Sequence, residues 1–555
     1  MADRVRDNAD EAADFETAIA ECGFGLFNVF ILCSAVPCLT AMVFSASALS
    51  YVMPSAECDL DLSIVDKGML HAVTYAGMII SAVPWGFIAD TIGRRPVLIS
   101  GGWLDGFFVL CASFSQDTAQ LMAFKFFDGF IICGPFAVVV SYLAEFHGKK
   151  HRPYIMLFVG LCVSIGSMIL PLLAYALMPV PIFFKVATLE FRTWQVFLAV
   201  SSVPSLLSGF LHIFLPESPK FLMSQGNYKK ALDSFQRIYK LNKRKSKESY
   251  PVKRLTDSTP DRSADLDGTG RTYTIKERFS RVKKKFIEGV RQLKPMFSKP
   301  YLAISLQVYC LHFCQIMCVN SVRLWLPQIF ATMNAMESLG ANDTSMCAVL
   351  EHNAMAVSMN EDDKRVECAL HHDPKSYLDN ITVAGIGLVG FLIIFPLLRI
   401  RVVSNHILKV FLFICIFLVG SLYFVKTSLM TMIISAIYLT LMGICATTII
   451  GMSVVIFPTL MRTMVLLLIM TFGRLGSVSG NLLLPIFMQL SCLAPFLWLC
   501  SLMCSGRSAI AELTHHTLFP DSLPQLFLIV CHRWLLGSIN NQCNRLCVKF
   551  NLITL

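Results

Sequence analysis

The stretch Gly86-Phe87-Ile88-Ala89-Asp90-Thr91-Ile92-Gly93-Arg94-Arg95-Pro96 decides how the rest of the chain is organised. It separates an apolar run at 68–88 from a second one at 97–114, and each run is long enough to cross a bilayer as a helix. Gly93 permits a sharp turn, Asp90 can accept charge-assisted hydrogen bonds, and the closing proline suits the first turn of a helix. The pattern therefore predicts a tight polar hairpin between two membrane-spanning helices.

The composition is that of a membrane protein. Of the 555 residues, 55% are hydrophobic and 15% are charged, whereas a soluble domain has about 25% charged residues. The net charge of +10 is concentrated in residues 223–299, which hold 21 Lys/Arg and 8 Asp/Glu, a net charge of +13. A basic block next to membrane spans is typical of a cytoplasmic segment facing anionic lipid, so we expect no nucleic-acid partner.

Twelve apolar stretches predict an all-α polytopic membrane protein with two sets of six spans. A cytoplasmic N-terminus (1–22) precedes the first six-helix bundle (23–222). The basic linker (223–299) leads to a second bundle (300–504), and an atypical tail (505–555) follows. The expected spans lie near 24–53, 68–89, 97–115, 119–142, 154–178, 194–215, 301–330, 381–398, 406–425, 429–457, 463–490 and 493–504. The last is short, with about twelve clearly apolar residues against the ~17 that a span needs.

Charge in the connections predicts the sidedness of the spans. Lys and Arg follow the even-numbered spans and acidic residues follow most odd-numbered ones, which places the N-terminus and residues 223–299 in the cytosol. The loop 331–380 is then extracellular or lumenal. It carries a glycosylation sequon at Asn342 and two cysteines, Cys347 and Cys368, that are candidates for a disulfide.

The basic segment contains two amphipathic patterns. Residues 227–241 have apolar side chains at helical spacing and a polar opposite face, and residues 275–293 repeat the pattern with three lysines at 283–285. These lysines are positioned either for lipid headgroups or for a solvated linker face.

Several motifs resemble the major facilitator superfamily. The hairpin pattern G-x-x-x-D-x-x-G-R-R closely resembles the loop between the second and third helices of that family, and the stretches 142–146, 215–222, 324–328 and 457–462 fit the sugar-porter and organic-ion branches. The stretches 54–57, 142–146 and 226–228 are similar to those of the synaptic vesicle glycoprotein 2-like proteins, which belong to this family. The resemblance covers roughly residues 20–496.

The resemblance implies two six-helix bundles around a central cavity that opens to one side at a time. Charged pairs at the cytoplasmic ends would differ between the two states, and the alternative is that these charges only set the topology. The residues that the resemblance assigns to gating are Gly86, Asp90, Gly93, Arg94, Arg95, Glu145, Arg152 and Glu217.

Ionisable and polar residues inside the spans are candidates for a solute or ion pathway, because burying them in a membrane is costly. Asp105 in the third span and Asp128 in the fourth both approach the middle of the membrane. Lys125 lies three residues before Asp128, where the family often carries an arginine, so a structural ion pair and a functional role are both open. The further candidates are His312 and Trp325 in the seventh span and Arg474 and Asn481 in the eleventh.

The first span departs from the resemblance. It has no acidic residue, and Met42 and Ser45 stand where the vesicle glycoproteins carry acidic positions, so proton coupling through this span is not expected.

Two hypotheses for function remain. One is a transporter that moves a small organic solute by alternating access, in the plasma membrane or a vesicle membrane. The other is a non-transporting vesicle or trafficking protein, or a receptor, with the same fold. The sequence contains no grouping typical of an enzyme, no filter loop of a channel and no motif for a cofactor or metal.

Overall fold

A computed structural model describes residues 12–186, 189–256, 297–298, 301–338, 345–349, 374–394, 401–457 and 462–518. The predicted glycosylation site Asn342, the amphipathic pattern at 275–293 and most of the C-terminal tail lie outside these residues.

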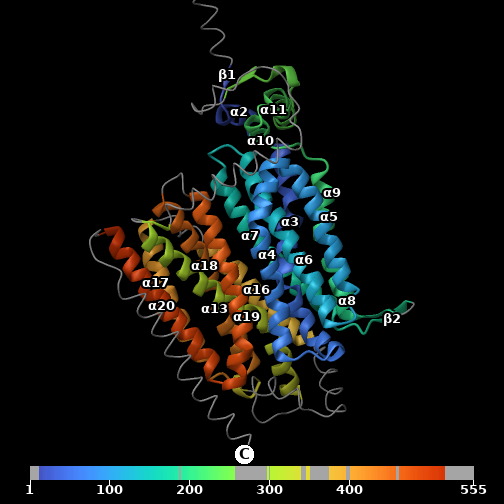
Figure 1. Cartoon of the computed structure of the whole chain (residues 1–555), viewed down its shortest axis with the longest axis vertical. Coiled ribbons are helices and arrows are strands. Elements are labelled where there is room, and N and C mark those ends of the chain that lie inside the picture. Colours follow the sequence, from blue (N-terminus) through green and yellow to red (C-terminus); the bar gives the residue numbers. More distant parts are fainter. Residues whose placement is uncertain are drawn as a thin grey trace, which may run out of the picture.

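The N-terminal half forms a bundle of six spans (Figure 1). Its helices are rich in apolar residues on all sides, as a segment needs when it faces both protein and lipid. They are α3 (Leu26–Leu60), α4 (Ile64–Ile92), α5 (Arg94–Ser113), α6 (Thr118–Glu145), α7 (Arg152–Leu177), and α8 (Thr193–Ser201) with α9 (Val203–His212).

The C-terminal half supplies six more helices. They are α13 (Leu302–Ser338), α16 (Pro374–Ile394), α17 (Arg401–Leu422), α18 (Ser428–Ile456), α19 (Arg462–Leu490) and α20 (Ala494–Leu518). Among the described residues, ten helices are long and apolar enough to cross a membrane, and 408–422 and 494–506 are shorter apolar stretches within α17 and α20. The predicted twelve-helix, all-α fold is confirmed, and the helix α20 continues beyond residue 505, where the tail was expected.

Two helix boundaries in the N-terminal half differ from the sequence-based expectation. The hairpin is shorter than predicted, because α4 continues through Asp90 to Ile92 and α5 begins at Arg94, which leaves Gly93 alone as the turn. The sixth span is divided at Ser202 into α8 and α9. Pro204 follows this break at the start of α9, where the missing N–H of a proline costs least.

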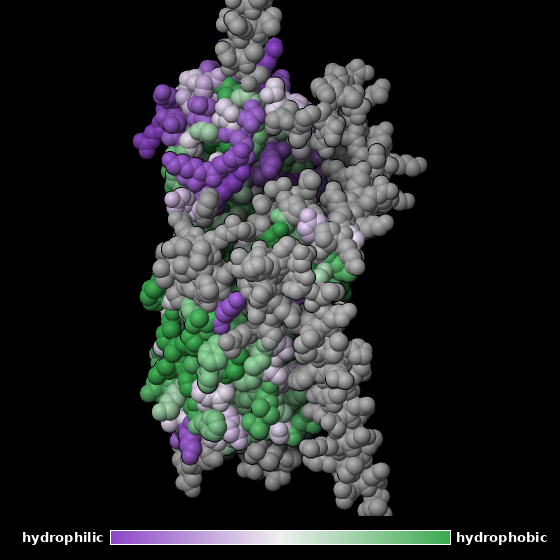
Figure 2. All heavy atoms as spheres, turned by 90° about the vertical axis from the view of Figure 1, so that its left-hand side faces the viewer, coloured by the Kyte–Doolittle hydropathy of each residue, from purple (hydrophilic) through white to green (hydrophobic). Residues whose placement is uncertain are grey.

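A small cap sits on the hairpin side, by which we mean the ends of the bundles that carry the Gly93 turn. It consists of α2 (Phe15–Cys22), α10 (Pro219–Ser224), α11 (Tyr228–Lys243), the turn η1 (Lys247–Ser249), and the parallel strands β1 (Ala12–Ala13) and β4 (Arg254–Leu255). Figure 2 shows hydrophilic side chains gathered over this end and apolar side chains over the flank of the bundles.

The cap ties the N-terminus to the segment that follows the sixth span. The predicted helix at 227–241 is α11, and its buried face (Ala231, Phe235 and Ile238) packs against α2. Asn242 at the end of α11 donates to the carbonyl oxygens of Cys22 (3.3 Å) and Gly23 (3.0 Å). The apolar face of α11 is therefore covered by protein.

The side opposite the hairpin, here called the far side, carries longer helices than expected. The helix α13 continues past residue 330 to Ser338, and α16 already begins at Pro374. On the same side, β2 (Phe183–Val186) and β3 (Leu189–Arg192) form a two-stranded antiparallel sheet after α7. The suggested Cys347–Cys368 disulfide is wrong: Cys347 is bonded to Cys492, which lies beyond the end of α19, with the two Cα atoms 5.2 Å apart.

Candidate functional site

The two halves meet along a seam formed by α4 with α19, α7 with α16, and α3 with α13. A polar network lies inside this seam. Arg323 on α13 donates to the hydroxyl of Tyr75 on α4 (3.2 Å) and to the side-chain oxygen of Asn320 (2.9 Å). The amide of Asn320 donates in turn to the hydroxyl of Ser477 on α19 (2.5 Å).

The predicted pathway residues of the second half lie along the same seam. Trp325 faces His71 of α4, with ring centroids 5.8 Å apart, and Arg474 donates to the carbonyl oxygen of Met78 at 3.3 Å. His312 packs against the backbone of Gly473 on α19, and Asn481 donates to the carbonyl oxygen of Ser477 (2.8 Å). The structure therefore brings these four residues to the contact between α4, α13 and α19.

Several buried polar atoms in the seam have no hydrogen-bond partner in the described part of the chain. They are the indole nitrogen of Trp325, Nδ1 of His312, Nε of Arg323 and the side-chain oxygens of Gln328 and Asn481. Buried polar atoms normally find partners, so donors and acceptors left open at an interface between two bundles can take a polar solute or water.

The residues that sequence reasoning missed in the seam are Arg323, Tyr75 and His71. Arg323 had a usable signal, because it is a charged residue in the middle of an apolar span. Tyr75 and His71 had none beyond their presence in a span.

Contacts across the seam differ between the two ends of α4. A Cβ atom added to Gly68 would lie 2.6 Å from the carbonyl oxygen of Asn481 and 2.8 Å from Pro485. Gly86 lies 18 residues away, five turns of a helix, and hence on the same face. In the described part of the chain, a Cβ atom added there would meet nothing within 4 Å. Among these residues, α4 therefore packs closely against the second half at Gly68 and makes no such contact at Gly86.

On the far side, a hydrogen bond to a paired carboxylate also crosses the seam. Lys67 on α4 contacts Glu57 on α3 at 2.5 Å, and Glu57 also accepts a hydrogen bond from Gln328 on α13 at 3.1 Å. Lys67 is nearly fully buried, so the pair is shielded from solvent.

The charged residues at the hairpin form one cluster within the N-terminal half. Arg94 contacts Asp90 (3.1 Å) and Glu145 (3.5 Å). Glu217 accepts hydrogen bonds from the backbone N–H groups of Arg94 (3.0 Å) and Arg95 (3.3 Å), the first residues of α5. Glu217 therefore caps a helix whose first N–H groups have no partner within the helix.

Burial and hydrogen bonding shift the pKa of the Glu217 carboxyl group in opposite directions. Desolvation raises the pKa of this carboxyl above its ordinary value, although the N–H donors of residues 94, 95 and 218 favour the ionised form. Gly93 fits this arrangement because its φ of +114° is one that other residues rarely adopt, and because the Glu217 carboxylate occupies the space where a Cβ would be.

The side chains of two predicted gating residues bind outside this cluster. The Arg152 side chain pairs with Glu16 of the cap (2.9 Å) and donates to the carbonyl oxygen of Ala144. The Arg95 guanidinium donates to the carbonyl oxygen of Ile213 at 2.8 Å. Arg152 therefore links the bundle to the N-terminal helix α2.

A second ionisable cluster lies inside the N-terminal bundle. The ammonium group of Lys125 contacts the carboxylate of Asp128, one turn along α6, and donates to the backbone carbonyl of Ser45 on α3 at 3.1 Å. Asp105 on α5 accepts a hydrogen bond from the hydroxyl of Ser205 on α9 at 2.5 Å. Asp105 and Asp128 are fully buried and Lys125 is 1% exposed, and the contacts named here all join helices of the N-terminal half.

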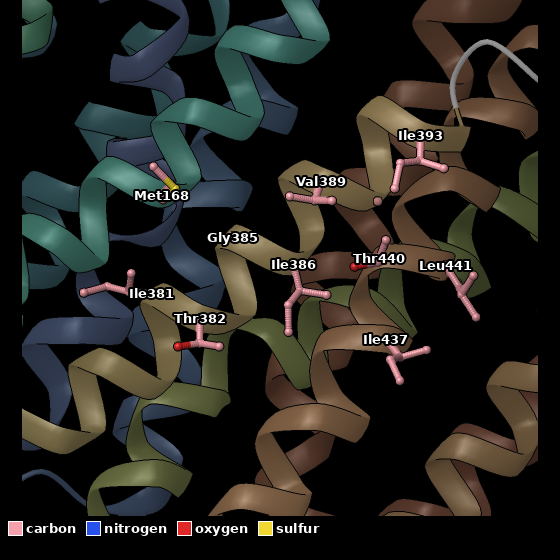
Figure 3. Close-up of a pocket in the computed structure, with 11 residues that line it drawn as sticks. Met168, Ile381, Thr382, Gly385, Ile386, Val389, Ile393, Ile437, Thr440 and Leu441 are labelled. Carbon is pink, nitrogen blue, oxygen red and sulfur yellow. The ribbon is translucent and has the colours of Figure 1, made fainter.

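An apolar groove of about 670 Å³ lies between α7, α16 and α18 (Figure 3). Met168, Ile386 and Leu441 are among its lining residues, and none of the pathway residues predicted from the sequence lines it.

The chain resembles known proteins in sequence over most of its length. The profile described as the Major Facilitator Superfamily matches residues 35–481. Synaptic vesicle glycoprotein 2B of Rattus norvegicus is 30% identical over 246 residues, and glycoprotein 2C of Mus musculus is 31% identical over 247 residues. Each alignment covers 44% of this chain, but only 36% and 34% of the respective relative.

Solved structures share the fold at low identity. A partially occluded, inward-open conformation of the xylose transporter XylE from E. coli matches with a TM-score of 0.59 and 14% identity, over 90% of this chain and 100% of that one. The same symporter bound to 6-bromo-6-deoxy-D-glucose matches with a TM-score of 0.59 and 15% identity, over 89% of this chain and 96% of that one.

Proposed function

This chain belongs to the Major Facilitator Superfamily, a family of membrane transporters, and we propose on that premise that it moves a small organic solute by alternating access. It is a multi-pass integral membrane protein. The observation that carries the proposal is the difference between the two ends of α4, which packs against the second half at Gly68 and, among the described residues, has nothing within 4 Å of a Cβ added at Gly86.

The solute pathway follows from this arrangement. With the far side closed, a solute would enter from the hairpin side and reach the open polar atoms of the seam, among them those of Trp325 and Arg323. Release on the other side requires the contacts around Gly68 to separate and those around Gly86 to form.

The hairpin cluster has a defined part in this movement. The contacts of Arg94 and Glu217 join α4, α5, α6 and the segment before α10, so these elements move as one body against the second half. A movement of whole bundles needs only the seam contacts to change, and each of those is worth little alone.

The test is uptake into liposomes that contain the purified full-length protein. Sugars come first, because the structural neighbours are xylose transporters, followed by organic cations and anions, each with and without a pH gradient. Arg474→Gln and Trp325→Ala are expected to lower uptake about tenfold or more, because the first removes the hydrogen bond to the Met78 carbonyl and the second removes the open indole donor that faces the seam. Lys185→Ala, on an exposed strand, is the matched control.

A second candidate function is that of a vesicle or trafficking protein that does not transport. It is favoured by the names of the aligned relatives and by the absence of an acidic residue in 25–51 of the first span. Absence of flux for every solute class would support it. Flux that Arg474→Gln and Trp325→Ala leave unchanged would instead remove those residues from the pathway.

A further inference from the structure

The buried cluster in the N-terminal bundle is short of positive charge. It holds two carboxyl groups, Asp105 and Asp128, and one ammonium group, Lys125, all at most 1% exposed. The Asp105 carboxyl lies close enough to Asp128 and Lys125 to interact with both. Two carboxylates side by side in a dry interior cannot both be ionised unless sufficient positive charge accompanies them.

The hydrogen bonds of the cluster leave one gap on each carboxyl group. Oδ2 of Asp128 contacts Lys125, and Oδ2 of Asp105 accepts from Ser205. Oδ1 of Asp105 and Oδ1 of Asp128 are both buried and have no partner in the described part of the chain. An unpartnered oxygen on each of two neighbouring buried carboxyl groups indicates a missing donor between them.

The surrounding elements offer no second cation in the described contacts of the cluster. The helix α3 contributes the carbonyl oxygen of Ser45 and the thiol of Cys38, and α9 contributes the hydroxyls of Ser205 and Ser208. On α4, which packs against α6, Lys67 is paired with Glu57, and His71 faces Trp325 in the seam.

We infer that Asp105 and Asp128 form a proton-binding site. Asp105 carries the proton as a carboxylic acid and donates a hydrogen bond to the Asp128 carboxylate. Asp128 stays ionised because Lys125 is its direct counterion, whereas Asp105 has only a hydroxyl as donor. One shared proton supplies the partner that each Oδ1 lacks and makes the cluster neutral: one ammonium, one carboxylate and one carboxylic acid. The site does not depend on the proposed transport.

The two substitutions that test this site are expected to differ in their effect on thermal stability. Asp105→Asn replaces the carboxylic acid with a neutral group of the same shape, so the variant is expected to fold and to keep the Lys125–Asp128 pair. Asp128→Asn leaves Lys125 buried without a counterion and is expected to unfold at a much lower temperature. Asp90→Asn, at an exposed carboxylate of the hairpin, is the control.

The experiment is infrared spectroscopy of the purified full-length protein in lipid, combined with its thermal midpoint across pH. The wild type is expected to show a carboxylic-acid C=O band near neutral pH that Asp90→Asn keeps and Asp105→Asn removes. On alkaline titration, the wild-type thermal midpoint is expected to fall as the pH rises toward the pH at which the band disappears and to level off above it, whereas the midpoint of Asp105→Asn stays flat.

Three results would overturn the inference: an unchanged band in Asp105→Asn, no band in the wild type at any pH, or a midpoint that follows sodium concentration instead of pH. If Asp105→Asn does not fold, the alkaline titration of the wild type decides alone, since its midpoint must stop falling at the pH at which the band disappears.

Discussion

Near each end of α4 lies a glycine, and the two glycines have opposite surroundings. Gly68 and Gly86 lie on one face of the helix, about 27 Å apart at 1.5 Å per residue. The first is pressed against the backbone of α19, and a Cβ added at the second would meet no described atom within 4 Å. The difference teaches that the close packing of α4 against the second half is found at the far side and, among the described residues, is not repeated at Gly86.

The largest expected effect is that of Gly86→Trp. Among the described residues, a Cβ added at this position would meet nothing within 4 Å, so folding and thermal stability should remain as in the wild type. If the hairpin ends must close during transport, the added ring blocks closure, and we expect solute uptake to fall more than about tenfold. Gly86→Ala is the matched control. Normal uptake by Gly86→Trp would show that the hairpin ends need not approach.

Gly68→Val tests the opposite end. Its added carbon atoms would collide with the Asn481 carbonyl and with Pro485, so we expect a loss of about 3 kcal/mol in the free energy of unfolding. The thermal midpoint of the purified protein measures this loss, with Gly86→Val as the matched control. Equal midpoints for the two valine variants would contradict the difference between the two ends.

Gly93→Ala tests the turn that ends α4. The φ of +114° is unfavourable for alanine, and the new Cβ would approach Phe221 to 3.0 Å and displace the Glu217 carboxylate from the start of α5. We expect a destabilisation of about 2 kcal/mol. If the midpoint is unchanged, neither the backbone angle nor the Glu217 cap matters at this turn.

Tyr75→Phe gives the smallest expected effect. It removes the hydroxyl that accepts from Arg323 across the seam, at a cost of about 1 kcal/mol to the conformation closed on the far side. A shift of that size should change the ratio of the two conformations about fivefold, which hydrogen exchange in the far-side half of α4 can measure. If Tyr75→Phe exchanges as the wild type does, the hydrogen bond from Arg323 does not stabilise the conformation that is closed on the far side.

The parts of the fold that depend on residues close together in the sequence could be predicted from it. The apolar runs define the spans, and Gly93 and Pro96 mark the turn, because span length and turn geometry are local properties. The break at Ser202 was missed, although Val203-Pro204 carried the signal. The helix α11 was predicted from its periodicity, but its partner α2 was not, since more than 200 residues separate them.

The site was predictable in part for the same reason. Polar residues within spans led to Trp325, Arg474 and Asn481, which do lie in the seam. Pairings between distant segments could not be deduced: Arg152 with Glu16, and Cys347 with Cys492, depend on how whole helices pack. Nor does any pattern in the sequence show that the carbonyl oxygen of Ser45 accepts from Lys125.

Alternating access is tested most directly by the distance across the hairpin-side mouth. Gly148, after α6, and Gly451, on α18, both have open space around them, so nitroxide labels can be attached there through a ketone-bearing non-canonical amino acid without removing native cysteines. Pulsed electron resonance of the protein in lipid is expected to show a long distance, with a second, shorter one that grows on adding a transported solute and that is missing in Gly86→Trp. One unchanging distance, the same in the wild type and in Gly86→Trp with every solute that is taken up, would contradict the account.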